Sequence, residues 1–280
     1  MLTTLNMHHI LKIWSFLLCI TISPFVSLSI ENYPAGARPL ALSNAFISLS
    51  GPWAVFHNQS GLASINNISA GFHYESRFCI DKLSQVAGSI VLPVRAGTFG
   101  LSFLQFGKGS YKEGKYAIAF ARQLSKIISA GIQLDYFTQA FPGKMQSRGS
   151  ATFEGGIIIK PLEKLYLGTH IFNPLSRGLN FPEGTQKMPV TIRAGGHYLP
   201  EKNILLIFEA EKDNLHPALL KTAIEYIPVE DLAIRFGVSG KPFRYTTGIG
   251  YRMNKITTDI GFGYHETLGL TPSVSIQFQL

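Results

Sequence analysis

The sequence predicts an all-β fold, a transmembrane antiparallel β-barrel of about fourteen strands with an N-terminal segment plugging the lumen. Apolar and polar residues alternate from Ile68 to Leu280 in segments about ten residues long, which is the length of a tilted strand in an outer membrane. Charged residues make up only 15% of the chain, against about a quarter in soluble globular proteins. The connections between segments alternate between short and long, as they do in outer-membrane barrels.

The first 29 residues have the organisation of a secretory signal peptide. Lys12 lies in a weakly basic start, residues 13–26 are apolar, and Ser27-Leu28-Ser29 has the small-x-small pattern of a cleavage site. A single transmembrane anchor is the alternative, but the apolar stretch is short for a membrane span and Pro24 interrupts it. We therefore expect export through a cleaved signal peptide. The expected domains are the signal peptide at 1–29, an N-terminal plug segment at 30–66 and the barrel at 67–280.

The last segment of the chain shows the period of two most clearly. Val274, Ile276 and Phe278 fall on one face, and Ser275 and Gln277 fall on the other, as in a strand with one apolar and one polar side. The pattern recurs along the chain and predicts fourteen strands, an even number as in bacterial barrels. They are expected near 67–76, 83–92, 97–106, 115–122, 127–138, 150–160, 164–173, 189–199, 203–212, 218–227, 231–239, 243–252, 255–265 and 272–280.

Two features favour a membrane barrel over a soluble β-sandwich, whose strands also have one polar face. The polar face carries charges in the middle of strands and many glycines, although glycine weakens a strand unless another group approaches its backbone closely. Tyrosines gather near the ends of the apolar faces, as in the aromatic girdles at membrane interfaces. The glycines of the polar face are Gly71, Gly100, Gly131, Gly156, Gly168, Gly195, Gly237, Gly248, Gly250, Gly261 and Gly263.

The connection lengths predict which end of the barrel faces which compartment. Connections after even strands, such as 161–163, are short, whereas those after odd strands include long ones at 107–114, 139–149, 174–188 and 266–271. Outer-membrane barrels have short periplasmic turns and longer outer loops. We therefore expect a bacterial outer-membrane location. Both chain ends, and the start of the N-terminal segment, are expected at the periplasmic mouth.

The stretch 36–63 is apolar and rich in small residues, yet it does not alternate like a strand. A disordered lead-in to the barrel is the alternative, but the stretch is too apolar for disorder. Fourteen strands enclose a lumen wider than wall side chains fill, so inward charges need water or an inserted segment. We expect a plug whose small residues pack on the inward glycines. The expected contacts are Arg38, Asn44, Trp53 and Asn58 of the plug and the inward acids Glu154, Glu209, Glu225 and Asp259, each a candidate partner of Arg38.

This stretch contains the motifs Gly36-Ala37-Arg38, Leu42-Ser43-Asn44-Ala45-Phe46, Trp53-Ala54-Val55-Phe56-His57-Asn58 and Gly61-Leu62-Ala63. Together they resemble the N-terminal signature of FadL-type outer-membrane barrels, most closely the PorV/PorQ-like branch of the Bacteroidetes. The chain departs from that pattern at Ser43-Asn44 and at Gln59-Ser60. The resemblance implies a fourteen-stranded barrel whose N-terminus folds into the lumen.

The resemblance implies functions of two classes. The first is an accessory or partner barrel in envelope protein secretion, such as type IX secretion, or in surface assembly. It predicts a sealed lumen and a stable complex with another envelope protein. The alternative is a FadL-like passive channel for small hydrophobic compounds. It predicts an apolar pocket between residues 36–63 and the barrel wall, with a gap or kink in the wall.

The sequence contains no H-E-x-x-H, no G-x-S-x-G and no Cys/His metal spacing. We therefore expect no catalytic, cofactor or metal site, and a protein that is not an enzyme.

The net charge of +8 falls to +7 when Lys12 leaves with the signal peptide. Outer loops without a recognition fold do not predict nucleic-acid binding; contact with outer-membrane lipid and anionic lipopolysaccharide, or ordinary solvation, is expected instead. The basic residues assigned to these loops are Lys108, Lys112, Lys115, Lys144, Arg148, Arg177 and Lys187.

Overall fold

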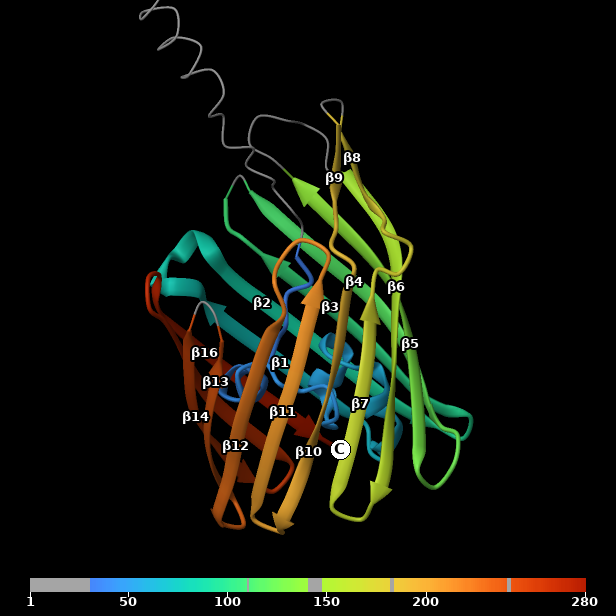
Figure 1. Cartoon of the computed structure of the whole chain (residues 1–280), viewed down its shortest axis with the longest axis vertical. Coiled ribbons are helices and arrows are strands. Elements are labelled where there is room, and N and C mark those ends of the chain that lie inside the picture. Colours follow the sequence, from blue (N-terminus) through green and yellow to red (C-terminus); the bar gives the residue numbers. More distant parts are fainter. Residues whose placement is uncertain (1–30, 110, 141–147, 182–183, 241–242) are drawn as a thin grey trace, which may run out of the picture.

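In the described part of the chain, fourteen strands close into one antiparallel barrel (Figure 1). The computed structural model describes residues 31–109, 111–140, 148–181, 184–240 and 243–280, and the predicted signal peptide lies outside the described residues. Pairing of β1 with β16 closes the sheet, with Ser69 opposite Gln279. A closed sheet has no free edge, as a bilayer requires. The predicted barrel of about fourteen strands is confirmed.

The barrel strands coincide with the fourteen predicted segments and differ from them mainly at the ends. Their bounds are β1 Ser69–Ser76, β2 Ser84–Val94, β3 Gly97–Phe106, β4 Lys112–Gln123, β5 Ile128–Ala140, β6 Arg148–Leu162, β7 Leu165–Phe172, β10 Thr191–Glu201, β11 Ile204–Asp213, β12 Leu219–Val229, β13 Leu232–Ser239, β14 Arg244–Met253, β15 Ile256–His265 and β16 Gly269–Gln279.

A small hairpin interrupts this order and was missed by the sequence analysis, which expected a loop at 174–188. Strands β8 (Gly178–Phe181) and β9 (Gly184–Lys187) pair only with each other, and β7 pairs directly with β10. Each strand of the hairpin has four residues, which is too short for a period of two to stand out. A buried cluster packs the hairpin onto the barrel; its members are Phe137, Phe172, Leu179 and Met188.

The wall of the barrel is apolar outside and polar inside. In β5 the neighbours Leu134 and Asp135 are 59% and 0% exposed, which reverses the burial expected in a soluble protein. The same alternation runs through β3, β14 and β15. The outward face therefore suits lipid, and the inward charges lie in the interior of the barrel.

The two ends of the barrel differ in their connections. Short turns such as 163–164, 202–203 and 230–231 lie at one end, called here the short-turn end, and longer connections such as 77–83 and 173–190 lie at the other, the long-loop end. The β1–β2 connection includes the 3-10 turns η3 (Arg77–Cys79) and η4 (Asp81–Leu83). Register shifts occur at the short-turn end of the β6–β7, β10–β11 and β12–β13 pairs. Each shift lies beside a proline, which cannot donate to the ladder; these are Pro161, Pro200 and Pro228.

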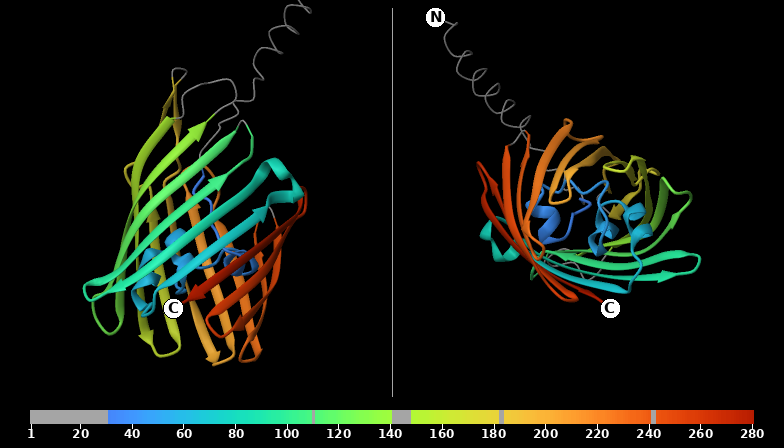
Figure 2. Two further views of the ribbon diagram at one scale, coloured as in Figure 1. Left: turned by 180° about the vertical axis from the view of Figure 1, so that it is seen from behind. Right: turned by 90° about the horizontal axis from the view of Figure 1, so that it is seen from below.

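The N-terminal segment lies inside the barrel (Figure 2). It forms a short helix, α2 (Ala37–Ala41), and two 3-10 turns, η1 (Pro52–Phe56) and η2 (Gln59–Ser64). Pro52 stands at the start of η1, where its missing N–H is not needed. Asn58 caps η2 by accepting a hydrogen bond from the Ser60 amide. Among the described residues, no helix is long and apolar enough to cross a lipid bilayer.

The direction of this segment corrects one sequence expectation. Tyr33 stacks on Phe106, with ring centroids 4.4 Å apart, and the Gln85 amide donates to the Pro34 carbonyl at 2.8 Å. Phe106 ends β3 and Gln85 is the second residue of β2, so both lie at the long-loop end. The described chain therefore starts at the long-loop end and reaches the short-turn end where β1 begins. The C-terminus lies at the expected short-turn mouth, whereas residue 31, where the described chain starts, does not.

Candidate functional site

Inward glycines let the N-terminal segment lie directly on the barrel backbone. A Cβ atom placed on Gly131 would lie 2.5 Å from the Ser60 nitrogen. One placed on Gly261 would lie 2.7 Å from the Ala37 carbonyl oxygen, and one on Gly100 would lie 2.8 Å from a Val55 methyl carbon. No such contact is sterically allowed, so only glycine fits at these wall positions. Backbone and side chains of 36–63 therefore pack closely against the wall at these positions.

Arg38 joins α2 to the wall through Glu225. Its Nε donates to Oε2 at 2.9 Å and its Nη2 donates to Oε1 at 2.8 Å, which is the bidentate arrangement typical of strong arginine–carboxylate pairs. The same carboxylate accepts from Arg235 Nε at 2.5 Å, and Arg235 Nη1 donates to Asp259 at 2.8 Å. Four alternating charges thus link the segment to β12, β13 and β15.

The side chain of Glu209 in β11 binds backbone amides of the N-terminal segment. Its Oε2 accepts hydrogen bonds from the amides of Phe46 and Ile47, both at 3.0 Å. Its Oε1 accepts from Lys221 Nζ at 3.0 Å, and Lys221 also donates to Glu211 at 2.7 Å. The carboxylate is buried, and the three hydrogen bonds that it accepts supply the compensation that a buried charge needs.

Glu154 is the centre of a second buried cluster. It accepts hydrogen bonds from Lys115 and from Gln59 of the segment, both at 2.9 Å, and from Asn32 at 3.2 Å. His170 Nε2 lies 3.3 Å from Oε2, the oxygen that also accepts from Asn32. Lys115 was assigned to an outer loop from the sequence, and this assignment is wrong. The reason is that β4 begins at Lys112, so Lys115 faces the lumen and is buried.

The remaining predicted plug residues lie in different surroundings. Trp53 is buried and stands edge-on to His73 at 5.9 Å. Asn58 Nδ2 donates to the Ile47 carbonyl at 2.6 Å and to the Thr169 carbonyl at 3.3 Å. Within the described residues, the Asn44 side chain makes no hydrogen bond to the wall. Its backbone is left-handed, with φ of 57°, a conformation that asparagine tolerates better than most residues.

Three basic neighbours of these acids were not among the expected contacts of the segment. Lys221 and Arg235 supply the positive charges beside Glu209 and Glu225, and Arg193 Nη2 donates to the His57 carbonyl at 2.7 Å. All three lie on the polar face of their strands, and a charge on that face was their sequence signal. Burial, followed by the nearby charge of Arg193, holds the pKa of His57 well below its usual value. His57 is therefore neutral at pH 7.

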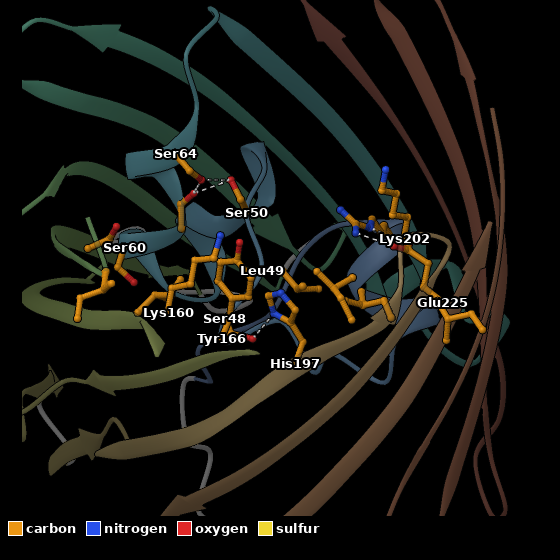
Figure 3. A pocket seen from close by; sticks show the side chains of 18 of the residues that line it. Ser48, Leu49, Ser50, Ser60, Ser64, Lys160, Tyr166, His197, Lys202 and Glu225 are labelled. Carbon is orange, nitrogen blue, oxygen red and sulfur yellow. Dashed lines mark hydrogen bonds and ion pairs between the residues drawn. The ribbon is translucent and has the colours of Figure 1, made fainter. Parts of the chain in front are cut away.

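A cavity of about 510 Å³ opens at the short-turn end between the N-terminal segment and the wall (Figure 3). Segment residues 48–50, Ser60, Gly61 and Ser64 form one side, and strands β5, β6, β7 and β10–β12 form most of the other. The aliphatic side chains on its lining are Leu49, Ile127, Ile158, Leu199, Ile204, Leu205 and Ile227; Lys126, Lys160 and Lys202 add positive charge. The cavity thus offers apolar surface within reach of several polar groups, as small-molecule sites do.

Two further cavities flank the segment. One of about 410 Å³ also lies at the short-turn end and has a mainly polar lining that includes Asn66, Asn67 and Gln277. Another of about 500 Å³ lies at the long-loop end and is lined by charged residues such as Arg77 and Glu211. In the described part of the chain, no cluster of three or more metal-ligating side chains has the arrangement of an ion site.

Neither protein-family models nor curated protein sequences gave a match to this chain. Solved structures did. The toluene transporter TbuX of Ralstonia pickettii is 10% identical, with a TM-score of 0.65 over 88% of this chain and 98% of that chain. The toluene transporter TodX of Pseudomonas putida is 11% identical, with a TM-score of 0.65 over 90% and 98%.

A FadL homologue from Pseudomonas aeruginosa is 12% identical, with a TM-score of 0.62 over 88% of this chain and 97% of that chain. At such identities the likeness establishes the fold. It does not reach the narrower PorV/PorQ-like resemblance, which stays a prediction. The chain therefore shares the barrel fold of solved FadL-type channels.

Proposed function

We propose that this protein is an outer-membrane channel for small hydrophobic compounds and that the N-terminal segment is its plug. The observation that carries the proposal is the cavity of about 510 Å³ between residues 48–64 and the wall. Its aliphatic lining removes apolar ligand surface from water, at roughly 25 cal/mol for each Å² buried. A pocket at this interface is one of the two features expected of the channel function, the other being a gap or kink in the wall.

The solved structures favour the channel over the secretion role that the resemblance placed first. TbuX and TodX are toluene transporters, and they share the fold of this chain over most of its length. An accessory barrel would need no apolar pocket beside its plug. The outward apolar wall and the even strand number support insertion into an outer membrane.

Contact of the long-loop end with lipopolysaccharide is part of the proposal. Lys108 and Arg177 lie in connections at this end, where positive charge attracts anionic head groups. Lys108 pairs with Asp81 at 2.9 Å, so only part of this charge is available.

The test is uptake of radiolabelled toluene by cells with and without the gene for this protein. The channel function predicts a slower initial rate in the deletion strain and recovery on complementation. Secretion of envelope proteins is measured in the same strains. An unchanged toluene rate with a loss of secretion would reject the channel and favour the accessory role.

A further inference from the structure

The cavity of about 510 Å³ at the short-turn end and the cavity of about 500 Å³ at the long-loop end lie on the same three wall strands. The cavity at the short-turn end, called here the inner cavity, touches His197 of β10, Leu205 of β11 and Ile227 of β12. The cavity at the long-loop end, called here the outer cavity, touches the same strands at Arg193, Glu211 and Lys221. The two cavities are therefore stacked along one strip of wall.

Little separates the cavities on the wall side. Between the two sets of lining residues, the inward positions are Gly195, Ile207, Glu209 and Ala223. Gly195 stands opposite Glu209, and Ile207 stands opposite Ala223 in the sheet register. Two of these four positions have almost no side chain, so the wall itself does not fill the space between the cavities.

The separation comes from the N-terminal segment. Ser43 and Asn44 line the outer cavity, and Ser48 and Leu49 line the inner one. The residues between them, 45–47, are fully buried. The Phe46 ring lies 5.0 Å from the His57 ring and 5.7 Å from the Arg38 guanidinium carbon. This short stretch is the barrier between two otherwise aligned spaces.

One wall side chain holds the barrier. Glu209 accepts both the Phe46 and the Ile47 amide on a single oxygen, and Lys221 fixes its other oxygen. Hydrogen bonds to a charged acceptor are the stronger kind, and buried amides that lose their acceptor are costly. Release of these two bonds would thus remove the direct hydrogen bonds from a wall side chain to residues 45–47 and leave Ile47 held through Asn58.

We propose that the two cavities are the ends of one conduit along β10–β12, that residues 45–47 close it, and that Glu209 is its latch. The inference rests on the proposed channel function for its physiological meaning. No sequence motif indicates that Glu209 is part of a gate. Glu209 acts here as a positioning residue for the segment.

The test measures access to the conduit through a cysteine in its wall. Both native cysteines, Cys19 and Cys79, are changed to serine, and Ala223→Cys is introduced between the cavities. The rate of reaction of purified full-length protein with a fluorescent maleimide is then compared with and without Glu209→Ala. This substitution leaves Lys221 paired with Glu211 at 2.7 Å, so it creates no unpaired buried ammonium group.

The latch predicts a labelling rate about tenfold faster or more with Glu209→Ala, because two buried amides lose their charged acceptor. Glu209→Gln, which satisfies either the amides or Lys221 but not both, should give an intermediate rate. Asp135→Asn is the matched control, since Asp135 is an equally buried lumen acid that contacts Lys115 and Gln133 but not the segment. It should leave the rate unchanged.

A heat-modifiable band on gels shows that each variant is folded, and if Glu209→Ala does not fold, the Gln variant decides. If the folded Glu209 variants and the parent are labelled at equal rates, Glu209 is not the latch, whatever the toluene uptake shows. Faster labelling in the Glu209 variants and also in Asp135→Asn overturns it as well, because loosening would then be general. Faster labelling confined to Glu209 variants without toluene uptake supports the latch and rejects the channel function, so the two failures are distinct.

Discussion

Arg38 of the N-terminal segment and Glu225 of β12 are joined by two parallel hydrogen bonds of 2.9 and 2.8 Å. They are separated by 187 residues in the sequence and meet near the short-turn end, where both line the cavity of about 510 Å³. Since Glu225 also binds Arg235 at 2.5 Å, the pair connects the segment to the charge network of the wall.

Arg38→Ala is expected to lower the heat resistance of the barrel in detergent. The Arg38 side chain is 26% exposed, and Glu225 keeps Arg235, so the expected loss is about 1 to 2 kcal/mol and a few degrees in the apparent midpoint. Unfolding of barrels is scan-rate dependent, so variants are compared at one rate. Arg252→Ala, which removes an exposed arginine near the same mouth, is the control. Equal midpoints for all three proteins would refute the pairing.

Two inward glycines are expected to respond oppositely to alanine. At Gly131 the new Cβ would lie 2.5 Å from the backbone of Gln59 and Ser60, whereas at Gly263 the nearest atom is a Leu40 methyl carbon at 3.5 Å. Gly131→Ala should therefore cost about 1 to 3 kcal/mol, and Gly263→Ala should be neutral or slightly stabilising. Melting in detergent measures both. A tolerated Gly131→Ala would mean that the segment does not lie on the wall.

Neutral His57 is expected to make the protein less stable in acid. Burial, then the charge of Arg193, holds its folded-state pKa well below the unfolded value of about 6.5. Unfolding then takes up a proton, so this contribution is complete above pH 6.5 and is lost as the pH falls below it. His57→Gln removes the titration, and its midpoint should fall less than that of the parent between pH 7.5 and 5. Parallel falls would show that other groups dominate.

Asn173 is expected to anchor the β8–β9 hairpin. Its Nδ2 donates to the carbonyls of Arg177 and Met188 at 3.1 Å, and its Oδ1 accepts from Thr152 at 2.8 Å. Asn173→Ala should speed proteolytic cleavage within 174–188 several-fold while the barrel stays folded, because local opening governs cleavage. Asn180→Ala, which removes one exposed hydrogen bond to Thr185, should not.

Sequence alone predicted the barrel strands well because each strand has an apolar outward face and a polar inward face, and that separation imposes a period of two. It named Arg38 but left four acids as equal partners, since the choice of Glu225 depends on sheet register and on the turn of α2. Lys221 was overlooked for the same reason. Glu209 binds backbone amides, and a sequence pattern does not indicate which backbone amides a side chain will contact. The hairpin and the entry side of the segment depend on tertiary packing and could not be read from periodicity.

The proposed channel function rests on the cavity beside the N-terminal segment, so a change in the lining of this cavity tests that function. Leu205 is buried and lines this cavity, whereas its neighbour Leu206 is 41% exposed on the lipid face. The most direct measurement is the initial rate of labelled toluene uptake by cells producing Leu205→Trp or Leu206→Trp at equal levels. The account predicts a rate near that of the deletion strain for Leu205→Trp and a parental rate for Leu206→Trp. Equal rates for both variants would contradict it.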